Sequence, residues 1–116
     1  MQLSLEQSGD VRIVRVNVGM LTYPVLSSFF DKVVQIVEEG ARKLVIDLEA
    51  VSLIDSESIG CLVQIHWLLK DRTGAVKVSA LQPRVHTMLS MAGVDRVLDL
   101  HRHTADALAA FAGPSA

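Results

Sequence analysis

The short apolar run from Lys43 to Leu48, with the sequence KLVIDL, is the feature that most constrains how this chain folds. A run of this length that is apolar at nearly every position is typical of a strand buried on both faces of a parallel sheet. Such a strand needs helices on the sheet to cover it and a crossover connection to reach its parallel neighbour. The run therefore predicts a domain of the α/β class.

The segments on either side of this run alternate between strand and helix patterns. β-Branched residues and turn signals predict strands over residues 3–6, 11–18, 43–48, 76–81 and 94–100. Apolar residues at helical spacing predict helices over residues 22–39, 59–71, 83–92 and 105–112. Thr22 is the candidate cap of the first helix, and Gly40, Gly74 and Gly93 are candidate helix stops. This order predicts a four- to five-stranded mixed sheet with about four helices packed mainly on one face.

The composition indicates one domain, because 116 residues are enough to bury a hydrophobic core. No apolar run approaches the ~20 residues that a membrane-spanning helix needs, and residues 1–6 lack the features of a signal peptide. The lone Cys61 excludes an internal disulfide and is typical of a reducing cytoplasm. A net charge of −2, with both signs scattered, gives no electrostatic surface for nucleic acid. We therefore expect a cytoplasmic domain over residues 1–112, with no membrane or direct nucleic-acid partner, and a disordered tail over 113–116.

Four polar residues stand between the next apolar segment and the second long helix, in the sequence Asp55-Ser56-Glu57-Ser58. Asp55, Ser56 and Ser58 all suit a helix N-cap, where a side-chain oxygen accepts a hydrogen bond from a free backbone N–H. The positive end of the helix dipole lies at the same place and favours an anion such as Glu57 or a phosphate group. The sequence leaves two interpretations open, a structural cap and a phosphate-dependent switch.

The helix over residues 59–71 has apolar residues on more than one side. One broad face predicts the core contact and consists of Ile59, Cys61, Leu62, Ile65, Leu68 and Leu69. A second face, mixed in polarity, consists of Val63, His66, Trp67 and Lys70. Tryptophan is common at binding hot spots, so this second face is the predicted partner-binding surface. The alternative is that Trp67 fills space against a neighbouring helix.

Residue patterns of enzymes and metal sites are scarce in this chain. It has no GxxxxGK[ST], GxGxxG or GxSxG motif. His101 and His103 form the one close histidine pair, and no third metal ligand is evident. Cys61 has no basic neighbour in the sequence to lower the pKa of its thiol, and nothing in the spacing pairs Ser56 or Ser58 with a histidine. We therefore expect no catalytic, cofactor or metal site in this chain.

Several segments together resemble the STAS domain, and within it the stand-alone anti-sigma factor antagonists of bacterial partner-switching systems. The resemblance covers nearly the whole chain and rests on the following segments: Gly19-Met20-Leu21 after a strand, the strand Leu44 to Leu48, Ser52 to Ser56 before a helix with Gly60, and the strand–proline–helix block Val76 to Gly93 with its closing Met91-Ala92-Gly93-Val94. It implies a single STAS domain over residues 1–112. It also implies a transcription regulator whose unphosphorylated form binds an anti-sigma factor that is a serine kinase. Phosphorylation before the second main helix abolishes binding in this family, and a PP2C-type phosphatase reverses it.

The switch loop, which we define as Asp55 to Gly60, departs from the family pattern. The usual sequence is Asp-Ser-Ser/Thr-Gly-Leu-Gly with the second hydroxyl residue phosphorylated, whereas Glu57 occupies that position here and Ser58 replaces the first glycine. One hypothesis is that the acceptor has moved to Ser56 or Ser58. The other is that Glu57 imitates the phosphorylated form permanently, because it brings a negative charge to the same place. In that case the protein is a non-switching STAS scaffold or binds a small anionic or nucleotide ligand.

Overall fold

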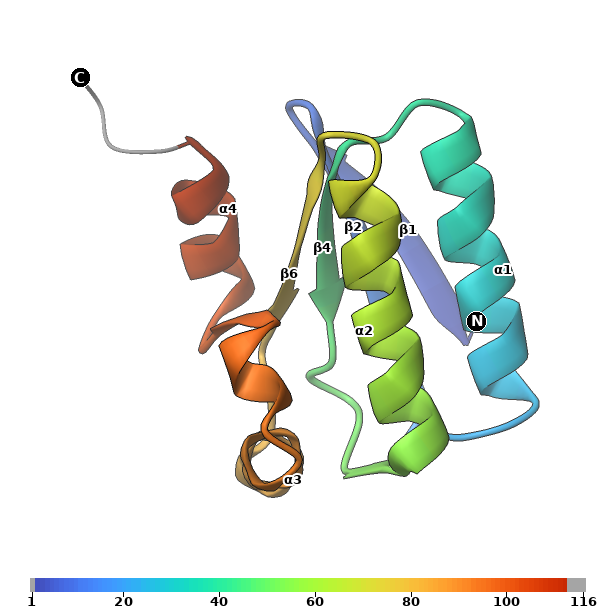
Figure 1. The fold of residues 1–116 in the computed structure, drawn as a ribbon, viewed down its shortest axis with the longest axis vertical. Helices are drawn as coiled ribbons and strands as arrows, with labels where there is room; N and C mark the ends of the chain where they lie inside the picture. Colours follow the sequence, from blue (N-terminus) through green and yellow to red (C-terminus); the bar gives the residue numbers. More distant parts are fainter. Residues whose placement is uncertain (1, 113–116) are drawn as a thin grey trace.

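Five strands form the sheet at the centre of the molecule in the computed structural model, which describes residues 2–112 (Figure 1). The strands are β1 (Leu3–Ser8), β2 (Val11–Val16), β4 (Lys43–Asp47), β6 (Ala75–Ser79) and β7 (Asp99–His101). They lie in the order β1-β2-β4-β6-β7, with β1 and β2 antiparallel and the remaining pairs parallel. The predicted mixed sheet is confirmed, and the run from Lys43 supplies its central strand. The predicted disordered tail at 113–116 lies outside the described residues.

Four helices cover this sheet (Figure 1). They are α1 (Val25–Glu38), α2 (Ser56–Lys70), α3 (Pro83–Met91) and α4 (Thr104–Ala112). Helices α1 and α2 lie side by side on one face, α3 lies near the carboxyl ends of the parallel strands, and α4 lies on the opposite face. No described helix has both the length and the apolar character needed to cross a membrane.

Two short strands, β3 (Met20–Leu21) and β5 (Leu53–Ile54), form a separate parallel pair that the sequence did not predict. The carbonyl of Gly19 accepts hydrogen bonds from the backbone N–H groups of Ser52 and Leu53, at 2.8 and 3.1 Å. This pair fixes the chain immediately before Asp55. It therefore determines where the switch loop leaves the body of the protein.

Two of the three glycines predicted as helix stops, Gly40 and Gly93, lie at helix ends with a positive φ, whereas after α2 the residue with a positive φ is Thr73 and not Gly74. At the end of α1, Gly40 has a φ of +113°, and its N–H donates to the carbonyl of Val37 while the N–H of Ala41 donates to Ile36. These two bonds are those of a Schellman motif. Gly93 ends α3 with a φ of +77°. An L-residue with a Cβ adopts such φ values at a cost, which explains the choice of glycine.

Three details of the predicted elements are wrong. Thr22 does not cap α1, which begins after Pro24 without a side-chain cap. Helix α2 begins at Ser56 instead of Ile59, because its cap is the first polar residue of the loop. The predicted final strand over residues 94–100 is a single 3-10 turn, Val94–Arg96, followed by the short β7. The turn forms because Gly93 reverses the chain directly before it.

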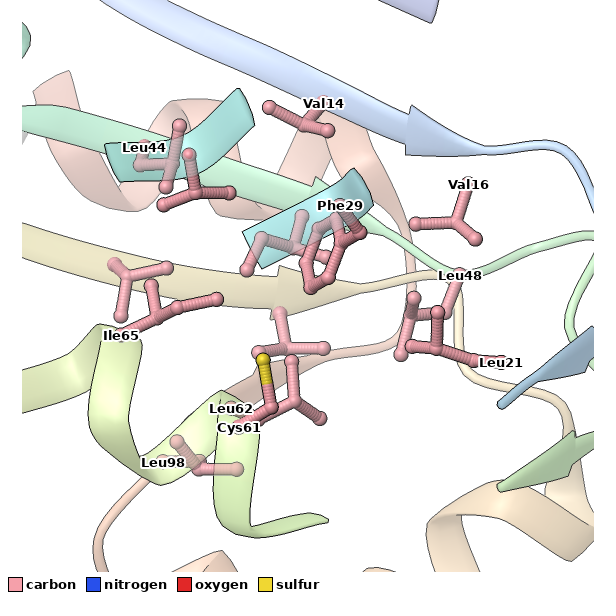
Figure 2. Close-up of a cluster of buried hydrophobic side chains, with 14 of the residues drawn as sticks. Val14, Val16, Leu21, Phe29, Leu44, Leu48, Cys61, Leu62, Ile65 and Leu98 are labelled. Carbon is pink, nitrogen blue, oxygen red and sulfur yellow. The ribbon is translucent and has the colours of Figure 1, made fainter. Parts of the chain in front are cut away.

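The main hydrophobic core lies between the sheet and the pair α1 and α2 (Figure 2). Neighbouring side chains of a strand point to opposite faces of the sheet. Leu44 and Ile46 of β4 therefore join this core, where they meet Phe29 of α1 and Leu62 of α2. All four side chains are almost completely buried. Burial of this apolar surface provides most of the free energy that holds α1 and α2 on the sheet.

The other face of β4 contributes Val45 and Asp47 to a smaller interface with α4. Val11, Ile13, Val45 and Ala107 form its apolar cluster, with Leu108 and Phe111 packed against them. Asp47 is 2% exposed, and its carboxylate forms an ion pair with Arg15. The same carboxylate accepts hydrogen bonds from the Thr104 hydroxyl at 2.7 Å and the Glu49 backbone N–H at 2.9 Å. These bonds fix the first residue of α4 to the end of β4.

Candidate functional site

The switch loop begins with a capping box that is built by Asp55 and Ser58. Asp55 is the N-cap of α2, and its carboxylate accepts a hydrogen bond from the Ser58 backbone N–H at 2.8 Å. The Ser58 hydroxyl accepts a hydrogen bond from the Asp55 backbone N–H and donates one to the Asp55 carbonyl, both at 2.8 Å. The box satisfies backbone groups that the first turn of a helix leaves without partners.

Ser58 is completely buried by this arrangement, whereas Ser56 and Glu57 are exposed. The cap interpretation of the sequence therefore applies to Asp55 and Ser58. Ser56 is the first residue of the helix and Glu57 the second, so both lie at the positive end of the helix dipole. Of the two hydroxyls in the loop, the one at Ser56 is open to a partner in this conformation.

One side of α2 faces solvent along its whole length. With about 100° per residue, Ser56, Gly60, Val63, Trp67 and Lys70 fall within roughly 40° of one line along the helix, opposite the core residues. We call these five residues the outer stripe. Trp67 is 56% exposed, so it is not a core residue, and Gly60 has open space where a side chain would begin. The outer stripe connects the exposed hydroxyl of the switch loop with the exposed tryptophan over about 17 Å of helix.

His66 lies beside the outer stripe and contacts Trp67. The two rings meet edge to face, with their centroids 4.8 Å apart and an interplanar angle of 78°. Partial burial, together with the nearby charge of Lys70, lowers the pKa of His66. The imidazole is therefore mainly neutral at pH 7, and it supports the indole ring more than it adds charge. The structure thus brings the four residues of the predicted partner surface together on α2.

One exposed apolar residue beside the switch loop and another just before α1 were missed in the sequence. Met20 is 54% exposed and pairs in register with Leu53, two residues before Asp55. Tyr23 follows at the start of α1 and is 77% exposed. Their signal is weak, because an apolar residue after a strand is usually taken as core. Only the pairing of β3 with β5 places Met20 beside the loop.

The remaining reactive groups singled out in the sequence are Cys61 and the candidate metal ligands. Burial raises the pKa of the Cys61 thiol to about 11, which keeps it protonated and unreactive at neutral pH. Among residues 2–112, no three His, Cys, Asp or Glu side chains lie close enough together to hold a metal ion. The loop and the outer stripe thus offer a surface for binding.

A five-stranded mixed sheet with two helices on one face, and a capped loop that leads into an exposed helix, define a small domain of the α/β class. The STAS domain family model matches residues 2–107, and the chain belongs to this family. It is 24% identical over 111 residues to the anti-sigma F factor antagonist of Paenibacillus polymyxa. The alignment covers 93% of this chain and 92% of that one.

Solved structures of anti-sigma factor antagonists have the same fold. An antagonist from Mycobacterium paratuberculosis is 26% identical and superposes with a TM-score of 0.83. The alignment covers 93% of this chain and 91% of that one. The antagonist SpoIIAA in its unphosphorylated form is 17% identical, with a TM-score of 0.82 over 98% of this chain and 99% of that one. SpoIIAA has also been solved in its phosphorylated form, which gives a TM-score of 0.73 at 16% identity, over 94% of this chain and 98% of that one.

Proposed function

We propose that this protein is an anti-sigma factor antagonist that binds an anti-sigma factor with serine-kinase activity. The observation that carries the proposal is the outer stripe of α2, which joins an exposed serine at the helix N-terminus to an exposed tryptophan. Apolar surface of this kind, on the helix that follows the switch loop, is a typical protein-binding surface. The names of the related proteins supply the kind of partner.

We further propose that Ser56 is the phosphate acceptor. Its hydroxyl is exposed, whereas the Ser58 hydroxyl is buried and holds the capping box. In the reaction, the Ser56 oxygen attacks the γ-phosphorus of ATP on the partner kinase, ADP leaves, and the serine proton passes to a base of the kinase. The new phosphate adds charge and bulk in the middle of the binding surface, so it separates the two proteins. A PP2C-type phosphatase restores the free hydroxyl.

The second candidate function is a regulator without a switch. Glu57 is exposed at the second residue of α2, where a negative charge is favoured by the helix dipole. A permanent charge at this place resembles a phosphorylated loop, and the protein then serves as a scaffold subunit or binds a small anion or nucleotide. Both candidates act in the cytoplasm and involve neither a cofactor nor catalysis by this chain.

Phosphate transfer separates the two candidates. The purified protein is incubated with ATP and a purified cognate kinase, and the products are mapped by mass spectrometry. We expect label on Ser56, loss of the label in Ser56→Ala and retention of the label in Ser58→Thr, which keeps a hydroxyl in the capping box. If the wild-type protein takes no label while Glu57→Ser becomes a substrate, the moved acceptor is wrong and the permanent mimic stands.

Partner binding by the outer stripe is tested with Trp67→Ala. We expect an affinity for the anti-sigma factor about thirtyfold lower, since truncating a hot-spot tryptophan commonly costs ~2 kcal/mol. The melting temperature should hardly change, because the side chain is more than half exposed. Met91→Ala is the matched control, since Met91 is 83% exposed on α3, away from α2. A large loss of stability with unchanged affinity would instead assign Trp67 a structural role.

A further inference from the structure

A pocket at the carboxyl edge of the sheet takes no part in the proposed function. It has a volume of about 370 Å³ and lies between the loop that follows β6 and the loop that follows β7. Its apolar lining comes from Leu81, Pro83 and Leu100. Thr87, His86 and Arg102 supply polar groups to the same pocket, and the ring of His101 completes it. Pockets of this size that combine apolar walls with convergent polar groups are found at small-molecule sites.

Arg102 is the main charged group of this pocket, and it has no carboxylate partner among residues 2–112. Arg15 and Arg72, in contrast, form ion pairs with Asp47 and Glu38. The positive charge of Arg102 is thus available to a ligand. An uncompensated guanidinium beside apolar surface is well suited to bind a carboxylate or phosphate through two parallel hydrogen bonds.

The nearby carboxylates do not cancel this charge. Asp99 forms an ion pair with Lys77, and its second oxygen lies 3.1 Å from Nε2 of His101, which has no hydrogen bond of good geometry among the described residues. The residues that line the pocket include no carboxylate. Glu49 lines an adjoining hollow that shares Arg102, but the two side chains form no ion pair in the described structure.

We propose that this pocket binds a small organic anion with a carboxylate or phosphate head on an apolar body, with Arg102 holding the head and Leu81, Pro83 and Leu100 contacting the body. The hydroxyl of Thr87 and the imidazole of His86 are further hydrogen-bonding groups for the head. The pocket lies on the same edge of the sheet as the switch loop, but it shares no residue with it.

The test is a titration of the ¹⁵N-labelled protein followed by NMR, with phenyl phosphate and benzoate as two separate probes. We expect saturable shifts confined to residues 81–87 and 100–103, and the stronger probe identifies the head group. Benzyl alcohol, which has a similar body without charge, and inorganic phosphate, which has no body, should each bind at least tenfold more weakly. No localised shifts with either probe, or equal binding of benzyl alcohol, would overturn the proposal.

Arg102→Gln and Arg96→Gln form a matched pair for the same titration. Both arginines are exposed, lie within six residues of each other and have no carboxylate partner in the described part of the chain, but Arg96 does not line the pocket. Arg102→Gln should weaken binding of the stronger probe about tenfold, which corresponds to ~1.4 kcal/mol, and Arg96→Gln should leave it unchanged. Equal losses in the two variants would show a general charge effect and no site at Arg102.

Discussion

The two faces of the sheet are covered by different means. On the face of α1 and α2, a continuous apolar core is closed by side chains such as Phe29 and Ile65, which are completely buried. On the face of α4, the apolar cluster has four buried members, and the buried Asp47 carboxylate joins the first residue of the helix to the sheet. Helices α1 and α2 are thus held mainly by apolar area, and α4 depends in addition on the geometry of a few polar bonds.

Because of this difference, substitutions on the two faces of the sheet should affect the stability of the protein in different ways. Apolar burial has no directional requirement and stabilises the whole domain. A buried carboxylate stabilises only if each of its partners is in place, because an unpaired buried group carries a desolvation cost. Loss of the first kind of contact should unfold the protein, whereas loss of the second kind should free α4 while the rest stays folded.

The largest effect is expected for Phe29→Ala in the α1 and α2 core. Truncating a fully buried phenylalanine typically costs about 3–5 kcal/mol through lost burial and the cavity that remains. Urea denaturation should show this loss in a single transition for all helices. Phe30→Ala is the control, since Phe30 is only partly buried and should cost clearly less. Similar losses in the two variants would contradict the description of Phe29 as the centre of this core.

A smaller loss with a different pattern is expected for Asp47→Asn. The change removes the negative charge that faces Arg15, and it leaves one side-chain oxygen instead of two to accept the hydrogen bond of Thr104. We expect a cost of roughly 1–3 kcal/mol in the free energy of unfolding. Hydrogen exchange should show the amides of α4 losing protection first, while those of α1 keep theirs. Asp31→Asn, at an exposed position on α1, should change the amide protection of neither helix. A uniform loss of protection across all helices would remove the distinction between the two faces.

Phe111→Ala tests the apolar part of the α4 interface and should have a smaller effect still. Phe111 is partly buried against the small cluster, and the ammonium of Lys77 lies 4.8 Å from the centroid of its ring. We expect a loss of about 1 kcal/mol by thermal denaturation, since an exposed cation–π contact contributes ~0.5–1 kcal/mol. Phe111→Leu, which keeps apolar contact but removes the ring, should recover part of the loss. No recovery would point to the ring itself as the important group.

The smallest effect is expected at Cys61, whose reactivity measures how well water is excluded from the core beneath α1 and α2. With a thiol pKa of about 11, Cys61 should react with a disulfide reagent at pH 8 far more slowly than the unfolded chain. Because burial raises the pKa of this group above its usual value of 9.0, the associated stability is complete below pH 9 and falls as the pH rises towards 11. Rapid labelling of the native protein at pH 8 would show that water reaches this core.

The parts of the fold that the sequence predicted are those with local causes. The run at Lys43 specified the central strand by its own composition, and Gly40 and Gly93 mark helix ends because the required φ values are positive. The bonds of Asp47 were not predictable in this way. Its charge was visible, but Thr104 lies 57 residues further along the chain, and only the completed fold brings the two together.

The switch loop was also only partly predictable from the sequence. The sequence identified Asp55, Ser56 and Ser58 as possible caps, since each has a suitable side-chain oxygen. Their division into a buried cap and an exposed hydroxyl depends on how β5 enters the helix, and β5 is held by the two-residue strand β3. Strands of two residues are too short to produce an alternating apolar and polar pattern in the sequence. The sequence left two possibilities for Trp67, a partner surface or packing against a neighbouring helix, and the structure shows it 56% exposed.

The unequal lengths of the two outermost strands have a consequence for how the protein behaves at high concentration. The β7 edge spans three residues and offers little to a strand from another molecule, whereas the β1 edge spans six. Unpaired edges of this kind are where chains join into aggregates, and a charged residue on such an edge opposes the joining. Glu6 occupies that place on β1 and is neighboured by Arg15. Besides forming its ion pair, Glu6 therefore places on this edge a charge that opposes pairing with a strand of another molecule.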